Sequence, residues 1–122
     1  MRLVVWRIVK TKYSENMFSG EGAAKFGGRW NSQATKVAYT SQSLSLAALE
    51  LLVHLEAASV KNRFVCACAE IPEDILIESI DPNLVDRSQE ELQAIGDRWI
   101  SSQSSAVLSV PSAVISVENS RL

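Results

Sequence analysis

The sequence predicts a single α+β domain in which strands gather around one long and one shorter helix. Two observations predict this fold. Residues 3–9 and 63–71 are rich in β-branched, aromatic and other apolar side chains, as strands are, whereas leucines and alanines recur at helical spacing over 43–58. A chain of 122 residues is long enough for one core and too short for two ordinary domains. Its content of 47% apolar and 21% charged residues is typical of globular proteins.

The predicted strands are short apolar runs bounded by polar or turn-forming residues. They are LVVWRIV (3–9), KVAYTS (36–41), RFVCACAEI (63–71), DILIESI (74–80) and AVLSVPSAVISV (106–117). The third of these runs reads as a mostly buried strand. Proline cannot donate a hydrogen bond to a neighbouring strand, so Pro111 is expected to divide the last run into two edge or bulge segments.

Two helices are predicted. The longer, SLSLAALELLVHLEAA (43–58), has serines at its plausible N-cap positions and contains no glycine or proline. The shorter, SQEELQAIGDRWISS (88–102), starts at Ser88 and carries two glutamates in its first turn. Residues 11–28 form a long, glycine-bearing loop with a helical turn near EGAAKF. Loops of that length in compact domains are commonly functional.

Charge and cysteine content argue against several classes of function. A net charge of −2 and a pI near 5.4 give no general attraction to DNA, so direct DNA binding is not expected. Cys66 and Cys68 share one strand face, and we interpret them as small apolar side chains in a reduced core. With one histidine in the chain, a metal site is not expected. The N-terminal apolar run is broken by Arg7 and is too short for a signal or membrane span, which predicts a cytoplasmic protein.

Arg29 stands in the pentapeptide GGRWN (27–31), directly after two glycines. Glycine adopts unusual backbone dihedral angles and lets a ligand come close. A guanidinium binds phosphate oxygens in a bidentate manner, so arginine is the expected residue where a pyrophosphate is held. The pattern fits an anion site, and it also fits a solvent-exposed turn.

Glu50 and His54 lie four residues apart in the longer predicted helix and therefore share one of its faces. One interpretation places both at the solvent edge of an amphipathic helix. The other opens the Glu50 carboxylate into a cleft, because its helix neighbours are so apolar, and acidic groups in clefts are functional candidates. Tyr39 and Trp30 would either stack on a nucleobase or pyridine ring or fill the core.

Several familiar catalytic patterns are missing. Ser112, in VPSAV, would be a nucleophile only beside a base, and the chain has no GxSxG nucleophile elbow, so a serine hydrolase is not indicated. The glycine-rich phosphate-binding motifs of dinucleotide-binding folds and of P-loop enzymes are also missing.

Five segments taken together resemble the RES domain family, the toxins of bacterial Xre–RES toxin–antitoxin modules, named for an arginine, a glutamate and a serine. The segments span nearly the whole chain. They are WRI (6–8), FSGEGAAKFGGRWN (18–31), VAYTSQSLSLAALELLVHL (37–55), AIGDRW (94–99) and VLSVPSAVISVEN (107–119).

The resemblance implies an ADP-ribosyltransferase-like fold, with a mixed β-sheet core and flanking helices, and the breaking of the nicotinamide–ribose bond of NAD. NAD is thus implied as the substrate, with no prosthetic group. By motif match, the family's active-site arginine, tyrosine and glutamate fall on Arg29, Tyr39 and Glu50. Arg7 matches a second arginine of the pocket. The family serine matches Ser112, with Ser88 as the alternative.

These matches imply a division of roles. The Glu50 carboxylate would stabilise the oxocarbenium-like ribose left when nicotinamide departs. Arg29 and Arg7 would hold the pyrophosphate, with the two glycines allowing the dinucleotide to approach. Tyr39 and Trp30 would pack on the nicotinamide, and His54 would lie outside the chemistry.

Residues 1–122 are thus expected to form one RES domain, with one departure from the family. Family members continue past Glu118 and Asn119 into a further segment, whereas this sequence ends in SRL. A missing strand or pocket wall would leave an exposed sheet edge. Two alternatives therefore stay open: an active enzyme, or a truncated, inactive relative that only binds nucleotide or antitoxin.

The leading hypothesis is an NAD-degrading toxin, an NAD glycohydrolase or NAD phosphorylase. Its partner would be an Xre-type antitoxin that blocks the cleft and binds DNA through its own helix-turn-helix region. A protein ADP-ribosyltransferase shares the first bond-breaking step and differs only in the acceptor. A homo-oligomer within the toxin–antitoxin complex is compatible with the resemblance, although nothing in the predicted helices marks a dimer face.

Overall fold

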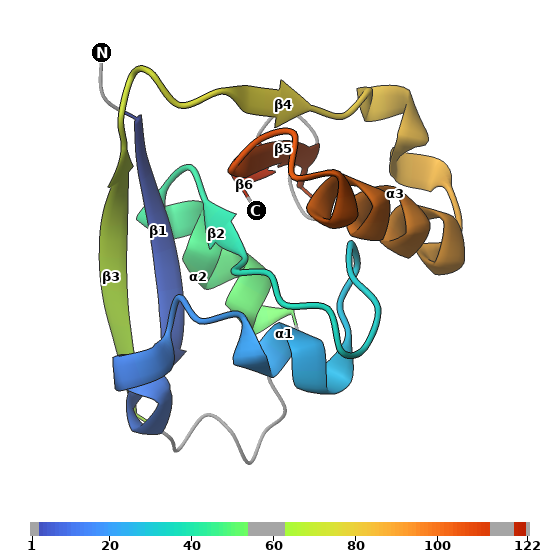
Figure 1. Ribbon diagram of the computed structural model, residues 1–122. Helices are drawn as coiled ribbons and strands as arrows, with labels where there is room; N and C mark the ends of the chain where they lie inside the picture. Colours follow the sequence, from blue (N-terminus) through green and yellow to red (C-terminus); the bar gives the residue numbers. More distant parts are fainter. Residues whose placement is uncertain (1–2, 54–62, 113–118, 122) are drawn as a thin grey trace.

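The structure, a computed structural model, describes residues 3–53, 63–112 and 119–121 and confirms the predicted α+β class (Figure 1). Six strands form one sheet in the order β3-β1-β2-β6-β5-β4. The strands are β1 (Leu3–Lys10), β2 (Thr40–Ser41), β3 (Phe64–Ile71), β4 (Ile77–Ser79), β5 (Val107–Pro111) and β6 (Asn119–Arg121). The helices are η1 (Thr11–Asn16), α1 (Glu21–Phe26), α2 (Leu44–Leu52), η3 (Pro82–Asp86) and α3 (Gln89–Ser102).

The sheet is mixed. β1 pairs antiparallel with β3 along its whole length, from Leu3 opposite Ile71 to Lys10 opposite Phe64. β2 pairs with β1 on one side and with β6 on the other, and β6 pairs antiparallel with β5. Among the strands of the described residues, only β4 and β5 run parallel. β6 thus completes the centre of the sheet, a strand that the sequence interpretation did not include.

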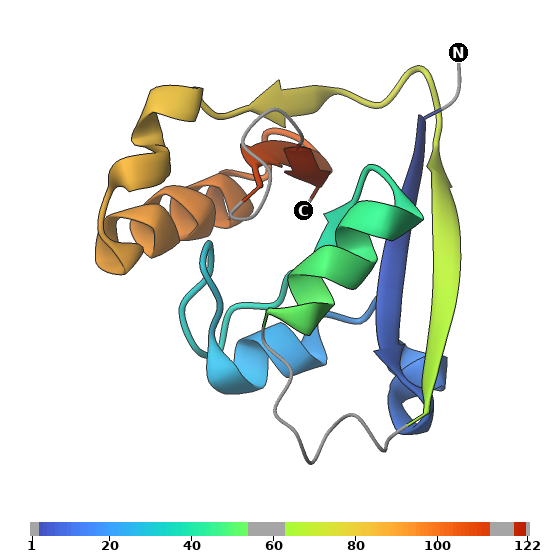
Figure 2. The same cartoon turned by 180° about the vertical axis from the view of Figure 1, so that it is seen from behind.

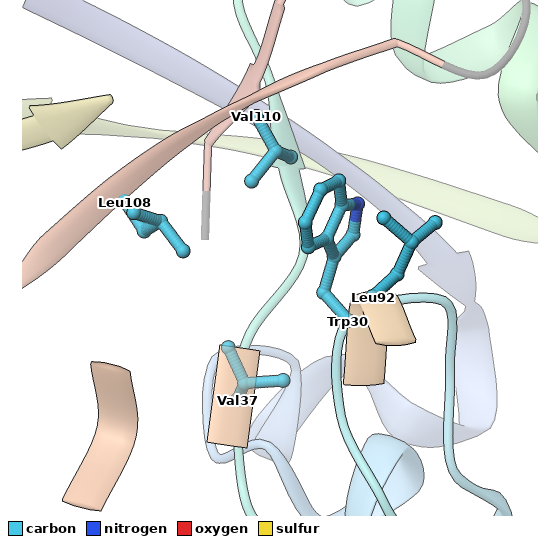
Figure 3. Packing of buried hydrophobic residues seen from close by; sticks show 5 residues of the cluster. All are labelled: Trp30, Val37, Leu92, Leu108 and Val110. Carbon is cyan, nitrogen blue, oxygen red and sulfur yellow. The ribbon is translucent and has the colours of Figure 1, made fainter. Parts of the chain in front are cut away.

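The two longer helices lie beside different parts of the sheet. Figure 2 shows α2 lying across β1 and β2, and α3 standing beside β5 on the other side of the molecule. A buried apolar cluster joins α3 to the strands and to the loop after α1 (Figure 3). Its fully or nearly buried members are Trp30, Val37, Leu92, Leu108 and Val110. In the described part of the chain, no helix combines the length and apolar character needed to cross a bilayer.

Two predicted strands are shorter than expected. KVAYTS keeps strand pairing only at Thr40–Ser41, because the backbone around Val37 packs against the loop before α1. A Cβ built on Gly20 would lie 2.7 Å from the Val37 nitrogen, which shows how close the two backbones are. DILIESI pairs only at Ile77–Ser79, because Pro72–Ile75 closes a turn through an amide–carbonyl bond of 3.2 Å.

The prediction of a mostly buried third strand, with both cysteines in the core, was wrong. β3 is an edge strand with one face open, and Cys66 and Cys68 are exposed on that face. The expected shared face of the two cysteines does agree with the alternating exposure along β3. The helical turn expected in EGAAKF is confirmed as α1, and the two longer helices are confirmed as α2 and α3.

Three of the predicted features fall partly outside the described residues. α2 begins after its N-cap Ser43, but the expected end of this helix near residue 58 and His54 lie beyond the described range 3–53. β5 confirms the first half of the strand predicted at 106–117, whereas residues 113–118 are not described.

Candidate active site

One cavity of about 380 Å³ lies between α1, α2 and the sheet. This volume is within the usual range of small-molecule sites. Five of the residues singled out from the sequence line it: Arg7, Arg29, Trp30, Tyr39 and Glu50. The sequence places them on four separate segments, and the fold brings them to one cavity.

Ser112 joins this group through Glu50. Its Oγ donates a hydrogen bond of 2.8 Å to Oε1 of Glu50, and the serine is only 4% exposed. Glu50 comes from α2, whereas Ser112 follows β5 directly. A hydroxyl donor beside a carboxylate stabilises its charged form and limits its rotation. The structure thus holds the Glu50 carboxylate in one orientation at the cavity wall.

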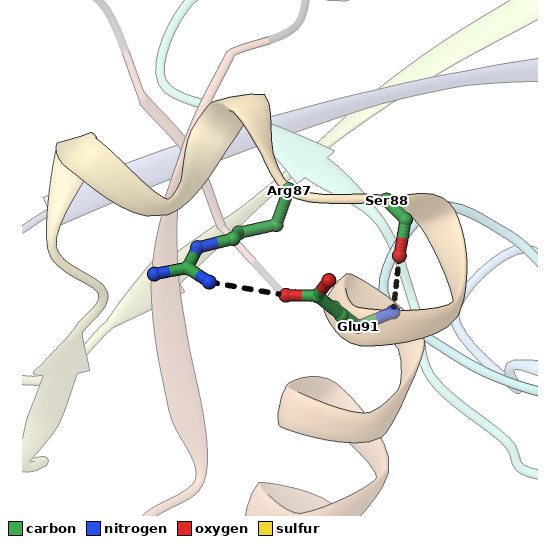
Figure 4. A network of polar contacts seen from close by, with 3 residues as sticks. All are labelled: Arg87, Ser88 and Glu91. Carbon is green, nitrogen blue, oxygen red and sulfur yellow. Dashed lines mark hydrogen bonds and ion pairs between the residues drawn. The ribbon is translucent and has the colours of Figure 1, made fainter.

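The alternative serine, Ser88, lies elsewhere and has a structural task. It is the N-cap of α3, where its Oγ accepts a hydrogen bond of 3.2 Å from the amide of Glu91 (Figure 4). The neighbouring Arg87 forms an exposed i,i+4 ion pair of 3.4 Å with the same glutamate. Ser88 therefore satisfies a helix terminus, and it does not line the cavity.

The loop that carries Arg29 is organised around Asn31, which is completely buried. The Asn31 carboxamide nitrogen donates to the carbonyls of Ala23 and Thr35 at 2.9 and 3.0 Å. Its oxygen accepts a hydrogen bond of 2.7 Å from the Tyr39 hydroxyl. One side chain thus joins α1, both ends of the loop and the segment before β2. The sequence interpretation assigned no role to Asn31, because only the fold shows that this side chain is buried.

Tyr39 completes this network and borders the cavity. Its hydroxyl also accepts a hydrogen bond of 2.9 Å from the amide of Trp30. Burial raises the pKa of the Tyr39 phenol to about 12, with the carboxylate of Asp97 adding to the rise, and the hydrogen bond from Trp30 and the nearby Arg29 opposing it. Tyr39 is therefore a neutral, doubly hydrogen-bonded phenol at neutral pH.

The two glycines before Arg29 serve the loop itself. Gly27 adopts φ +72°, a conformation that other residues rarely take. A Cβ on Gly28 would lie 2.7 Å from the Asn31 side-chain oxygen and 2.8 Å from the Tyr39 hydroxyl. The sequence interpretation expects these glycines to let a dinucleotide approach Arg29, and both of them line the cavity. Next to Gly28, the Tyr39–Asn31 contact also occupies the space that a side chain would need.

Arg29 extends from this loop toward the end of β5. Its Nη1 lies 3.4 Å from the carbonyl oxygen of Pro111, and its guanidinium carbon is 5.8 Å from the centre of the Trp30 ring. Trp30 itself is 2% exposed and packs in the core between α3 and the strands (Figure 3). Its indole therefore fills the core, which is the structural alternative to stacking on a ligand, whereas Arg29 is partly exposed at the cavity.

Arg7 is more constrained than a surface arginine. Its Nε donates to the carbonyl of Met17 at 2.5 Å and its Nη1 to the carbonyl of Tyr39 at 2.9 Å. Burial lowers the pKa of this guanidinium from its usual value. Arg7 thus ties β1 to two neighbouring segments and also lines the cavity.

Three residues of α3 contact the Arg29 loop. Gln93 donates from Nε2 to the carbonyl of Gly28 at 2.8 Å. Asp97 accepts from the amide and the hydroxyl of Ser32 at 3.0 and 2.5 Å. At Gly96 the backbones touch, since an added Cβ would lie 1.7 Å from the Trp30 carbonyl oxygen. These contacts were not expected from the sequence, although a glycine inside a helix often marks close packing.

Metal binding has no support among the residues that the structure describes, where no group of three His, Cys, Asp or Glu side chains is placed to hold an ion. The cavity instead combines one carboxylate with two guanidinium groups and a neutral phenol. Such a set suits an anionic ligand whose reaction develops positive charge near the carboxylate.

Comparison with known proteins establishes the family of this chain. The RES domain model matches residues 4–120, and the chain belongs to the RES domain family. It is 35% identical to a protein of Yersinia enterocolitica named Toxin Res, over 98% of this chain and 82% of that protein. It is 32% identical to a protein of a Sphingobium strain named Prs ADP-ribosylating toxin, over 96% of this chain and 79% of that protein.

The fold has a close counterpart among solved structures. A chain in the crystal structure of the M. tuberculosis MbcT–MbcA toxin–antitoxin complex superposes with a TM-score of 0.75. The match covers 99% of this chain and 73% of that chain, at 17% sequence identity. At this identity the likeness establishes the fold, so the site must be argued from this chain's own residues.

Proposed function

We propose that this protein is the toxin of a RES-type toxin–antitoxin module and that it degrades NAD by cleaving the nicotinamide–ribose bond. The single observation that carries the proposal is the convergence of Arg29 and Glu50 on one cavity. Two adjacent residues link the pair, since Pro111 accepts from Arg29 and Ser112 donates to Glu50.

The carboxylate of Glu50 supplies the electrostatic part of this reaction. When the bond between C1′ of the ribose and the pyridine nitrogen breaks, the electron pair leaves with nicotinamide and C1′ becomes cationic. A fixed negative charge nearby stabilises that cation, most strongly where water is excluded. Ser112 keeps the carboxylate oriented and hydrogen-bonded. The acceptor oxygen then forms a bond to C1′, and an acceptor that is water releases a proton.

Arg29 and Arg7 bind the dinucleotide. Arg29 offers its guanidinium to the pyrophosphate, and Arg7 adds a second guanidinium at the cavity. Both contacts are made in the ground state as well as in the transition state, so they bind NAD with its scissile bond beside Glu50. Tyr39 borders the same cavity as a neutral aromatic wall for the nicotinamide, while Trp30 supports the loop from the core.

Protein ADP-ribosylation is the second candidate, because the Sphingobium relative carries the name Prs ADP-ribosylating toxin. The two reactions share the cleavage step and differ in whether a water, a phosphate or a protein side chain attacks C1′.

The cytoplasm, where NAD is available, is the proposed site of action. An Xre-type helix-turn-helix antitoxin that covers the cavity is the proposed partner, and the structural neighbour from a toxin–antitoxin complex supports an antitoxin partner.

The test is nicotinamide release from NAD by the purified chain, with and without phosphate, beside Glu50→Gln and the matched control Glu90→Gln on the exposed first turn of α3. Loss of one catalytic electrostatic interaction is expected to reduce turnover on the order of 10²-fold or more for Glu50→Gln, with Glu90→Gln unaffected. Dependence on phosphate would identify an NAD phosphorylase. Binding of NAD without release of nicotinamide would identify an inactive relative and reject the enzymatic proposal.

A further inference from the structure

We propose that Gln93 and Asp97 of α3 are positioning residues for Arg29, so that the direction of the guanidinium in the cavity depends on this helix. The inference rests on the proposed function for its consequence in NAD binding. Neither residue lines the cavity, and each would act only through the loop that carries Arg29.

The contacts of α3 lie on both sides of Arg29 along the chain. Gln93 holds the carbonyl of Gly28, immediately before Arg29. Asp97 holds the amide and hydroxyl of Ser32, three residues after it. The two side chains are four residues apart and therefore project from one face of the helix.

The backbone of the loop is held between these contacts as well. Gly96 lies on the same face of α3 and allows the helix to touch the Trp30 carbonyl. The Tyr39 hydroxyl also accepts a hydrogen bond from the Trp30 amide. The peptide units on either side of Arg29 are thus held by α3 and by Tyr39.

This arrangement has a physical reason. A long arginine side chain loses considerable rotational entropy on binding an anion, and a mobile backbone would add to that cost. A loop that is already fixed at both ends lowers this entropic cost, because its backbone does not have to be ordered when the anion binds. A displaced Arg29 loop would therefore weaken the binding of NAD, so contacts remote from the chemistry can matter for its affinity.

The experiment compares Asp97→Ala, Asp97→Asn, Gln93→Ala and Ser32→Ala with the control Glu90→Ala. Asparagine at position 97 keeps an oxygen for the Ser32 amide and can donate to the Ser32 hydroxyl, so it should rescue the loop. Ser32→Ala removes the hydroxyl contact from the loop side and leaves α3 intact. Thermal unfolding establishes that each variant is folded before the other measurements.

Two readouts are taken. The first, which needs no activity, is amide hydrogen exchange at Trp30, whose own partner is Tyr39. We expect about 10-fold faster exchange in Asp97→Ala and Gln93→Ala, a smaller increase in Ser32→Ala, and wild-type exchange in Asp97→Asn and Glu90→Ala. The second is nicotinamide release, where we expect the KM for NAD to rise about 10-fold while kcat stays within about 3-fold, because pyrophosphate binding is common to ground and transition states.

The outcomes separate the two proposals. Unchanged Trp30 exchange in folded Asp97→Ala and Gln93→Ala would overturn the positioning role, whatever the protein does with NAD. Altered exchange with unchanged KM would overturn the link to Arg29. A wild-type protein that neither binds nor cleaves NAD would reject the proposed function, and the exchange data would then still decide whether α3 orders this loop.

Discussion

Ser112 and Glu50, which are 62 residues apart in the sequence, are joined by a hydrogen bond of 2.8 Å at the cavity wall. The bond links the end of β5 to α2. Pro111, the residue directly before Ser112, accepts a hydrogen bond from Arg29 through its carbonyl oxygen. The Glu50 carboxylate is therefore bound to the residue next to the one that contacts Arg29. The first prediction follows from this bond.

Replacing Ser112 with alanine is expected to lower nicotinamide release on the order of 10-fold, because the Glu50 carboxylate loses a charged hydrogen bond worth about 1.5 kcal/mol or more. Ser88→Ala is the matched serine control. It should cost about 1 kcal/mol of the free energy of unfolding through loss of the α3 N-cap and leave turnover unchanged. Urea unfolding and steady-state kinetics measure both effects. Reduced turnover only in Ser88→Ala would reverse the assignment.

Gly28→Ala is expected to destabilise the protein by about 2 kcal/mol, because the new methyl group would push against the Asn31 carboxamide and the Tyr39 hydroxyl. Gly22, in α1, has no atom within 4 Å of an added Cβ. Gly22→Ala should therefore stabilise by about 0.5–1 kcal/mol, the usual gain of alanine over glycine in a helix. Chemical denaturation compares the two variants, and equal stabilities would contradict the packing described for Gly28.

The raised pKa of Tyr39 predicts a loss of stability in alkali. The folded protein keeps the phenol proton up to a pH of about 12, whereas an unfolded chain releases it near pH 10. Above pH 10 the unfolded state therefore binds fewer protons, and the free energy of unfolding falls as pH rises from about 10 to about 12. Urea unfolding at several pH values should show this fall, and Tyr39→Phe should reduce it. An identical slope in the variant would exclude Tyr39 as its cause.

The open face of β3 predicts reactive thiols. Cys66 and Cys68 are both exposed, so a thiol reagent such as DTNB should modify two groups per chain in the native protein without denaturant. Cys66→Ser and Cys68→Ser should each remove one equivalent. Reaction only after unfolding would support the buried core position that the sequence first indicated.

The local sequence pattern was sufficient to predict much of the fold. Apolar periodicity predicted α2 and α3, and capping serines marked the start of both helices at Ser43 and Ser88. The prediction that β3 is mostly buried was wrong, because an apolar composition does not distinguish an edge strand from a central one. β6 was missed because strand pairing at the centre of the sheet depends on neighbours that are distant in sequence.

The sequence by itself determined the fold class, the family resemblance and the group of candidate residues, because these depend on residue type, order and spacing. Only the tertiary structure decided that Ser112 contacts Glu50 while Ser88 caps a helix, and that Trp30 lies in the core. It also showed that α3 holds the Arg29 loop through Gln93 and Asp97. The physical reason is that hydrogen bonds and burial arise from three-dimensional neighbours, and here those neighbours are 62 to 65 residues apart in the chain.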